Sequence, residues 1–421
     1  MAAALWVFVE RPSVPDGMDD RWWSLIVLAL LAGVALLAFR AGAREDHSAS
    51  TPAPAIASGE GAVATPPARP VLLVRGAAVA TRCGHDPEAV LQALGPQPSM
   101  PEPDTDWLDD QGLPRLSARC STLDVSRVTA ALTASTSDAA AGRPGLVRAL
   151  ALQADALDGL QAAVQALPCH GGLEVHWTVP DHWNEEERRR AHDWLMNDLT
   201  ARLPPDAGPV TIRLVGPAGL GASLDRLCLR TLGPDTPPCE SRATLVLACD
   251  SLIDPQQTAS AALPGEAAAA LLVEPQLPDE TLPQEGVLAR VSWPGLPSSA
   301  SPSECSLRDL AAQVLDTACE ATVVGRVLSD VGLTGPEARQ VLDATVELLP
   351  QLDVGERLCR IGLACGDLGC AGPLVALALG SHAAHQDGAA ALLLLTGRQP
   401  ATALLTPMRP ATPSPARAAS H

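Results

Sequence analysis

Short apolar segments alternate with segments of helical periodicity along residues 70–406, and the alternation occurs twice in a similar order. Apolar runs of about four to eight residues are typical of buried strands, and a repeat of about 3.6 residues is typical of helices. Strands are predicted at 71–80, 173–179, 210–215, 243–248, 271–274, 287–291, 390–395 and 403–405. Helices are predicted at 86–94, 146–167, 184–199, 222–232, 306–318, 334–348 and 371–379. This order predicts an α/β fold whose sheet is covered on both faces, and it suits a duplicated layered architecture.

Local signals refine these boundaries. Residues 95–120 are rich in Pro and Asp and are predicted to form a loop or insertion. Three helix starts place a short polar residue three positions before an acidic one, which is a capping pattern. These pairs are Asn184 and Glu187, Ser306 and Asp309, and Thr334 and Glu337.

The composition limits both the core and the class of function. The chain has no Tyr and no Lys, and its Phe residues, Phe8 and Phe39, both lie near the N-terminus. Its folded part is therefore packed with Leu, Val, Ala and Trp, a bias typical of GC-rich bacterial genomes. The net charge of -19 argues against nucleic-acid binding, because phosphate binding needs clustered cations. The 11 Cys include no CxxC pair, which predicts buried free thiols in a reducing compartment.

The N-terminal region carries a membrane signal. After an N-terminal segment at 1–21, Trp22–Phe39 is an apolar run without charge, flanked by interfacial Trp and by Arg40. It predicts one transmembrane helix in a bacterial inner membrane, and the free thiols favour a cytoplasmic domain. A signal peptide ending at Ala41-Gly42-Ala43 is the alternative. Residues 40–69 are predicted to be a flexible linker and 407–421 a disordered tail.

Four segments of the region 70–406 resemble a known family. They are Val71–Gly84, which covers the first strand and the turn after it, Leu245–Leu252, Pro264–Leu272 and Gly366–Gly372. In this order and spacing they resemble the β-ketoacyl-acyl-carrier-protein synthases of the thiolase-like superfamily. The third is similar to the family's Pro-Gly-Glu-Gly-Ala stretch, and the fourth to its Gly-His-x-x-Ala-Ala-Gly turn. The resemblance implies a duplicated αβαβα sandwich whose motif residues here are Gly265, Glu266, Gly366, Gly369 and Gly372.

The resemblance also implies where catalysis would occur, and this chain differs there. Family members use a Cys at a helix N-terminus and two His, or a His and an Asn, that stabilise an enolate. The Cys position falls at Pro217 or Ala218, and Cys228 comes about two turns too late. The first His position falls at Asp330 and the second at Asp367. No catalytic group is therefore predicted, and we expect Asp367 to cap a helix or to bond local amides.

Other residues offer weaker signals. His382 and His385 have a spacing that would suit a metal pair, but a polar connection before a strand favours solvent exposure. No metal site and no cofactor is predicted.

Three functional hypotheses follow from the resemblance. The first is a membrane-anchored, catalytically degenerate β-ketoacyl-synthase-like protein that binds or scaffolds, as a homodimer or with a partner ketosynthase. The second is an inactive chain-length-factor-like partner of an active ketosynthase. The third is an acyltransferase with relocated catalytic groups, using Cys249 or Cys365.

Overall fold

The computed structural model describes segments that all lie within the compact unit Pro67–His421. They are residues 71–109, 111–134, 143–167, 172–204, 207–216, 224–225, 227, 243–253, 263–276, 286–293, 306–317, 323–332, 335–396 and 400–408. The predicted span at Trp22–Phe39, the linker at 40–69 and positions 409–421 of the predicted tail lie outside these residues. No helix in these segments combines the length and the apolar character that a membrane crossing requires.

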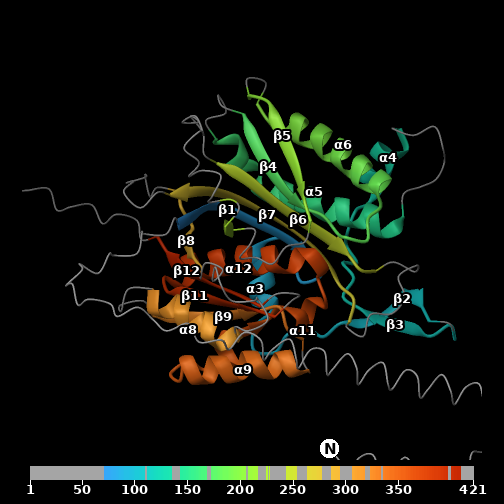
Figure 1. The fold of residues 1–421 in the computed structure, drawn as a ribbon. Helices are drawn as coiled ribbons and strands as arrows, with labels where there is room; N and C mark the ends of the chain where they lie inside the picture. Colours follow the sequence, from blue (N-terminus) through green and yellow to red (C-terminus); the bar gives the residue numbers. More distant parts are fainter. Residues whose placement is uncertain are drawn as a thin grey trace, which may run out of the picture. The chain divides into compact units, whose positions relative to one another are not determined.

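The first half of the chain contributes five strands to a mixed sheet (Figure 1). From the middle of the sheet outward they are β1 (Val71–Thr81), β7 (Glu266–Gln276), β6 (Thr244–Ser251), β4 (Leu173–Thr178) and β5 (Val210–Val215). The β1·β7 and β7·β6 pairs are antiparallel, whereas the β6·β4 and β4·β5 pairs are parallel. Strands β6 and β7 are buried on both faces, as expected for strands covered by helices on each side.

The second half repeats this arrangement strand for strand. From the middle outward it contributes β8 (Ala289–Ser292), β12 (Ala401–Pro407), β11 (Ala390–Leu395), β9 (Val324–Ser329) and β10 (Leu358–Arg360). The β8·β12 and β12·β11 pairs are antiparallel, and the β11·β9 and β9·β10 pairs are parallel. The predicted duplication is therefore present in both strand order and strand direction.

The two halves join through their first strands. Strands β1 and β8 pair antiparallel, with Leu72 opposite Val291 and Val74 opposite Ala289, so that one ten-stranded sheet runs through both halves. Its two outer strands differ in length, because β5 has 6 residues and β10 has 3. The sheet is therefore symmetric in topology and unequal at its ends.

The helices form layers on the faces of this sheet (Figure 1). Helix α12 (Gly372–Asp387) packs against strands of both halves and, with α3 (Pro87–Ala93), forms the central layer. The outer layer of the first half contains α4 (Ser126–Ala134), α5 (Pro144–Gln165) and α6 (Glu185–Arg202). The outer layer of the second half contains α8 (Leu307–Thr317) and α9 (Pro336–Leu348). Shorter elements complete the described part of the chain, namely α10 (Val354–Arg357), α11 (Ile361–Cys365) and the 3-10 turn η2 (Gly369–Ala371).

The core is divided by the sheet. One cluster of buried side chains fills the central layer around α12, and two further clusters fill the two outer layers. Helix α12 is buried almost all round from Gly372 to Ala384, so it is built from Ala and Leu rather than from one apolar face. In the outer layer of the first half, Trp177 and Trp183 meet edge to face with ring centroids 6.2 Å apart.

Two predicted helix caps are confirmed and one is wrong. Asn184 accepts a hydrogen bond from the Glu187 amide while the Glu187 carboxylate accepts one from the Asn184 amide, which is a complete capping box. Ser306 and Asp309 likewise bond to each other at the start of α8. Helix α9 instead begins after Gly335, without a side-chain cap, and the proline that follows supplies a suitable backbone angle.

Several boundaries also differ from the predictions. The predicted loop at 95–120 contains an antiparallel hairpin, β2 (Glu102–Leu108) and β3 (Pro114–Ser117), whose polar side chains are mostly exposed. Helix α12 extends to Asp387, so His382 and His385 lie in a helix and not in a polar connection. His385 is exposed as expected, whereas His382 is half-buried, and this burial lowers the His382 pKa.

Candidate functional site

The two glycine-containing motifs from opposite halves of the chain lie side by side. The Asp367 amide donates to the Leu263 carbonyl at 2.7 Å, and the Gly265 amide donates to the Asp367 carbonyl at 2.9 Å. On the other side of the same segment, the Ala118 amide donates to the Pro264 carbonyl at 2.9 Å. Three chain segments of distant origin therefore form a small ladder at the position that the resemblance assigns to the active-site loop.

Close backbone approach explains why glycines occupy this ladder. A Cβ atom at Gly265 would lie 2.0 Å from the Cys365 carbonyl oxygen. Gly369 has a φ of +53°, and a Cβ there would lie 2.1 Å from an Asp250 carboxylate oxygen. Gly366 also has a positive φ, of +69°. Only glycine fits such positions without displacing its neighbours. At Gly372 an added Cβ would meet nothing closer than 3.7 Å, so this glycine is not required by space.

Asp367 is exposed and bonds locally. Its carboxylate accepts a hydrogen bond from the Gly369 amide at 2.9 Å. This agrees with the expectation that Asp367 bonds local amides, and it fixes the turn that leads into η2. An ionised carboxylate is only an acceptor, so at this position it offers no hydrogen-bond donor to a developing oxyanion.

Asp330 links the ends of two strands. It follows β9, and its carboxylate accepts hydrogen bonds from the Thr396 amide at 2.8 and 3.1 Å and from the Thr396 hydroxyl at 3.1 Å. Thr396 follows β11, so the contact holds two parallel neighbours together at their carboxyl ends. Pro217, Ala218 and Cys228, where the nucleophile was sought, lie outside the described residues.

Asp250 and Cys370 form a buried polar contact beneath the loop. The Cys370 amide donates to Asp250 Oδ2 at 2.9 Å, and the Cys370 thiol contacts the Cys249 carbonyl oxygen at 3.4 Å. Burial raises the Asp250 pKa to about 7, and the nearby charge of Asp367 acts in the same direction, against the lowering effect of the Cys370 amide. Asp250 thus titrates near neutral pH at the end of β6.

Glu266 is the best-connected motif residue. Its side chain is fully buried, and its carboxylate accepts hydrogen bonds from Nε and Nη2 of Arg148, the one from Nε at 2.8 Å. It also accepts from the Cys120 amide at 2.7 Å and the Ser251 hydroxyl at 3.0 Å. Arg148 in turn donates to the Cys120 carbonyl at 2.9 Å. A buried carboxylate with this many donors is a structural hub, and the distant Arg148 was not foreseen from the sequence.

The described cysteines are free, and most are buried as predicted. Cys120, Cys249, Cys359 and Cys365 are buried, whereas Cys83 and Cys370 are half-buried. Burial raises the Cys249 pKa far above its ordinary value, and contact with Cys83 together with burial does the same for Cys365. Both thiols are therefore protonated at neutral pH, which argues against them as relocated nucleophiles.

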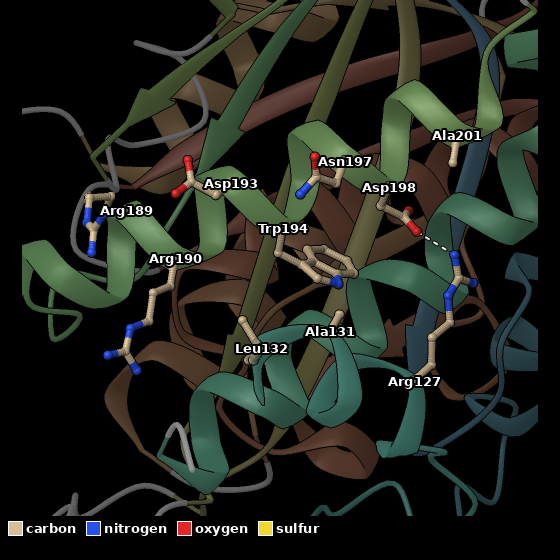
Figure 2. A pocket seen from close by; sticks show the side chains of 10 residues that line it. All are labelled: Arg127, Ala131, Leu132, Arg189, Arg190, Asp193, Trp194, Asn197, Asp198 and Ala201. Carbon is tan, nitrogen blue, oxygen red and sulfur yellow. Dashed lines mark hydrogen bonds and ion pairs between the residues drawn. The ribbon is translucent and has the colours of Figure 1, made fainter. Parts of the chain in front are cut away.

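A cavity of about 310 Å³ lies between helices α4 and α6 of the outer layer. Figure 2 shows Trp194 of α6 directed toward Ala131 and Leu132 of α4. The cavity is lined by Arg127, Ala131, Leu132, Arg189, Arg190, Asp193, Trp194, Asn197, Asp198 and Ala201. Each arginine that lines the cavity forms an ion pair. Arg127 pairs with Asp198, and Arg189 and Arg190 of α6 both pair with Glu186. The positive charges that line the cavity are therefore balanced by carboxylates, and the cavity is a gap between two helices rather than a site for an anion.

Comparison with known proteins gives a result at the level of structure only. No family model matches the chain, and no curated protein sequence matches it. The ishigamide ketosynthase/chain length factor is similar to it with a TM-score of 0.50 and 15% identity, over 80% of this chain and 98% of that chain. A module 6 ketosynthase of the bacillaene synthase from Bacillus subtilis 168 gives a TM-score of 0.54 and 12% identity, over 81% of this chain and 71% of that chain. The PfaC ketosynthase-chain length factor gives a TM-score of 0.50 and 13% identity, over 82% of this chain and 43% of that chain.

These likenesses extend over about four fifths of this chain. The chain has the thiolase-like fold of the ketosynthases, as the sequence resemblance implied. At such low identity the likeness shows the fold, and function has to be argued from the residues of this chain.

Proposed function

We propose that this protein is a membrane-anchored, non-catalytic ketosynthase-like subunit that binds a partner chain. The observation that carries the proposal is the bonding of Asp330 and Asp367, the two residues that the sequence resemblance aligns with the family's oxyanion-stabilising groups. Both carboxylates accept hydrogen bonds from backbone amides and so serve to hold loops in place. Decarboxylative condensation needs donors to an enolate at these positions, and carboxylates do not supply them.

The outer strand β5 supports partner binding. Among the described residues it pairs only with β4, and the side chains of Thr211, Arg213 and Leu214 are exposed. Leu214 is 39% exposed and so adds an apolar side chain to this edge. An open edge strand with apolar side chains is a template for pairing with another chain. The partner is a second copy or, by analogy with the ketosynthase/chain length factor pairs, an active ketosynthase.

The anchor is part of the same proposal. The apolar run Trp22–Phe39 has the length of one bilayer span, and the segment 40–69 has the composition of a flexible tether. The arrangement holds the domain at the cytoplasmic face of a bacterial inner membrane. Deletion of 22–39 is expected to move the protein from the carbonate-resistant membrane fraction to the soluble fraction. Recovery of the deleted form in that membrane fraction would contradict the anchor.

The catalytic half of the proposal is tested with the full-length chain and a malonyl thioester of an acyl-carrier protein. Release of CO₂ is the readout, since it reports the step that the missing donors would serve. We expect no release above the protein-free background. Release that persists in the purified chain would overturn the proposal, because the chain would then be a ketosynthase in its own right.

The binding half is tested by a photo-crosslinking residue placed at Leu214 in the native host. Val323, which is 70% exposed and lies in the second half just before β9, is the matched control position. We expect position 214 to crosslink either a second copy or a ketosynthase that retains its catalytic Cys and His residues. Equal yields from positions 214 and 323, or no adduct from 214, would show that β5 is not the binding edge.

A further inference from the structure

Residues 81–84 form a closed turn that presents a cysteine at the end of β1. The Thr81 amide donates to the Gly84 carbonyl at 2.8 Å, and the Gly84 amide donates to the Thr81 carbonyl at 3.2 Å. The Cys83 amide donates to the Thr81 hydroxyl oxygen at 3.1 Å. These three hydrogen bonds fix the backbone that carries the Cys83 thiol, and Cys83 is half-buried and so remains partly open to solvent.

Arg82 places a positive charge beside this thiol. Its guanidinium donates to the carbonyls of Ser99 at 3.1 Å and Met100 at 3.0 Å, and to the Ala364 carbonyl at 3.4 Å. These acceptors are carbonyl groups and not carboxylates, so the guanidinium keeps its full charge in these contacts. A cation held in this way favours a thiolate at Cys83 and stabilises negative charge that develops next to it.

A second thiol lies behind the first. Cys365 ends α11 and is fully buried, and its thiol donates a hydrogen bond to the Cys83 sulfur at 3.4 Å. This contact is the largest cause of the lowered pKa of Cys83, and the charge of Arg82 adds to it. The same contact, together with burial, raises the pKa of Cys365. The Cys83 sulfur therefore has thiolate character, and the Cys365 sulfur holds a proton at contact distance from it.

Other described thiols have different surroundings. Cys370 is half-buried like Cys83, but it lies against the Cys249 carbonyl, and burial and the charge of Asp250 raise its pKa. Cys120 contacts a histidine at 3.7 Å, yet it is 3% exposed and burial raises its pKa. Cys83 is therefore the one of these three thiols that combines access, a nearby cation and a second sulfur.

We propose that Cys83 and Cys365 form a site of reversible oxidation by small hydroperoxides such as hydrogen peroxide. The Cys83 thiolate attacks one peroxide oxygen, the O–O bond breaks, and the other oxygen leaves as hydroxide beside Arg82. Cys83 is then a sulfenic acid. The Cys365 sulfur next bonds to the Cys83 sulfur, and the hydroxyl group leaves as water with the Cys365 proton. The two sulfurs together give up two electrons, which reduce the peroxide, and a dithiol reverses the change.

The disulfide would join the two halves of the chain. Cys83 lies in the turn after β1, and Cys365 directly precedes the loop that carries Asp367. This inference goes beyond the proposed function and is independent of it, because it involves no carrier protein, no CO₂ release and no pairing through β5. Failure of either test therefore leaves the result of the other unchanged.

The test uses the reduced, folded full-length chain and hydrogen peroxide. Dimedone traps sulfenic acids, and mass spectrometry maps every cysteine. We expect the Cys83–Cys365 disulfide as the main product and oxidation of Cys83 about 10-fold or more faster than that of Cys370, the effect of at least one pKa unit on the thiolate fraction. The rate at Cys83 should rise with pH around a midpoint below the ordinary thiol pKa of 9.0. Dithiothreitol should restore both thiols.

Variants separate the parts of the site. Cys365→Ser keeps a hydrogen-bond donor but cannot form the disulfide, so the dimedone adduct of Cys83 should accumulate. Arg82→Gln should slow oxidation of Cys83 by about 10-fold and move the pH midpoint upward, and Arg82→Lys should recover much of the rate because it keeps the charge. Oxidation of Cys370 should change less than about twofold in each variant. The near-ultraviolet circular dichroism of the tryptophans reports that the fold is kept.

Two results with the wild-type chain would overturn the proposal, and neither depends on the folding of a variant. One is equal oxidation rates at Cys83 and Cys370, which would show that access alone decides the reaction. The other is a dimedone adduct at Cys83 without any disulfide to Cys365, which would show that the second sulfur takes no part.

Discussion

The sulfur atoms of Cys83 and Cys365 lie 3.4 Å apart, although 282 positions separate the two residues. Cys83 is in the turn after β1, and Cys365 ends α11, directly before the loop that carries Asp367. The hydrogen bond from the Cys365 thiol, assisted by the charge of Arg82, holds the pKa of Cys83 below its ordinary value in spite of burial. The lowered pKa makes the Cys83 thiol the more reactive of the two, and the Cys365 thiol is in contact with it.

We therefore expect the oxidant diamide to join Cys83 to Cys365. Closing so long a loop stabilises the chain by up to about 5 kcal/mol in the chain-entropy account, so the melting temperature should rise. Peptide mapping without reduction identifies the bridge, and Cys83→Ala should abolish both the bridge and the rise. Cys359→Ala is the control, since Cys359 is buried on β10 and should leave both unchanged. A bridge between any other pair of cysteines would contradict this expectation.

The ladder at Gly265 gives a prediction about stability. Gly265→Ala would bring a Cβ to 2.0 Å from the Cys365 carbonyl, so the backbone of one segment has to move. We expect a loss of about 2–4 kcal/mol in the free energy of unfolding, measured with urea on the full-length chain. Gly216→Ala is the matched control, because no atom of the described residues lies within 4 Å of the added Cβ. Equal stability of the two variants would show that the ladder relaxes without cost.

The buried ion pair of Glu266 and Arg148 gives a second prediction about stability. Glu266→Leu leaves the Arg148 charge buried without its partner, and removal of one member of such a pair costs about 3–5 kcal/mol. The double variant Arg148→Met/Glu266→Leu removes both charges and should recover part of this loss. It should not recover all of it, because the Cys120 amide and carbonyl lose their partners as well. Urea unfolding of the three proteins measures the difference, and a double variant less stable than the single one would contradict this account.

Asp250 gives a prediction about pH. Its folded pKa of about 7 lies above the ordinary value of 3.8. Between these two values the folded chain holds a proton that the unfolded chain has lost, so the contribution of Asp250 to stability falls as the pH rises from about 4 to about 7. At the 1.36 kcal/mol that corresponds to one pKa unit, the fall amounts to at most about 4 kcal/mol.

The measurement is the free energy of unfolding across this pH range. Asp250→Asn removes the titration, so its profile should be flatter than that of the wild type, and the variant should be relatively more stable above pH 7. Asp343→Asn changes an exposed carboxylate on α9 and should leave the slope as it is. Parallel profiles for the wild type and Asp250→Asn would show that Asp250 remains ionised in the folded chain.

The parts of the fold that could be predicted are those whose cause is local. Runs of Val and Leu marked β1, β6 and β11, and the capping residues marked the start of α6 and α8. The repeated order of these segments was enough to indicate a duplicated sheet. The glycine motifs could be found through their resemblance to the family, whereas the contact between them became visible only in the structure.

What could not be predicted depends on burial from more than one side. Strand β7 begins with Glu266 and four alanines, and alanine has little strand propensity. The segment is a strand because helices cover both of its faces. Helix α12 has no polar face to show its period, so its length was underestimated. The hairpin of β2 and β3 is polar and buries little, so its segment had the composition of a loop.

The candidate sites show the same limit. Glu266 was recognised as a motif residue, but its partner Arg148 is 118 positions away and carries no pattern of its own. Cys83 and Cys365 come from different halves of the chain, and no spacing in the sequence connects them. The cysteines selected from the sequence, Cys249 and Cys365, are the more deeply buried ones. Cys83 lies in the turn that follows the predicted first strand, and this position was the signal that could have directed attention to it.

The unequal ends of the described sheet bear on the proposed partner binding through β5. Strand β5 offers six residues of edge, whereas β10 at the opposite end offers three. Two chains that meet through β5 would use the long edge of each, and the short β10 edges of the described ten-stranded sheet would stay free. Three residues offer little backbone for pairing, so growth of such a pair into a filament through β10 is disfavoured.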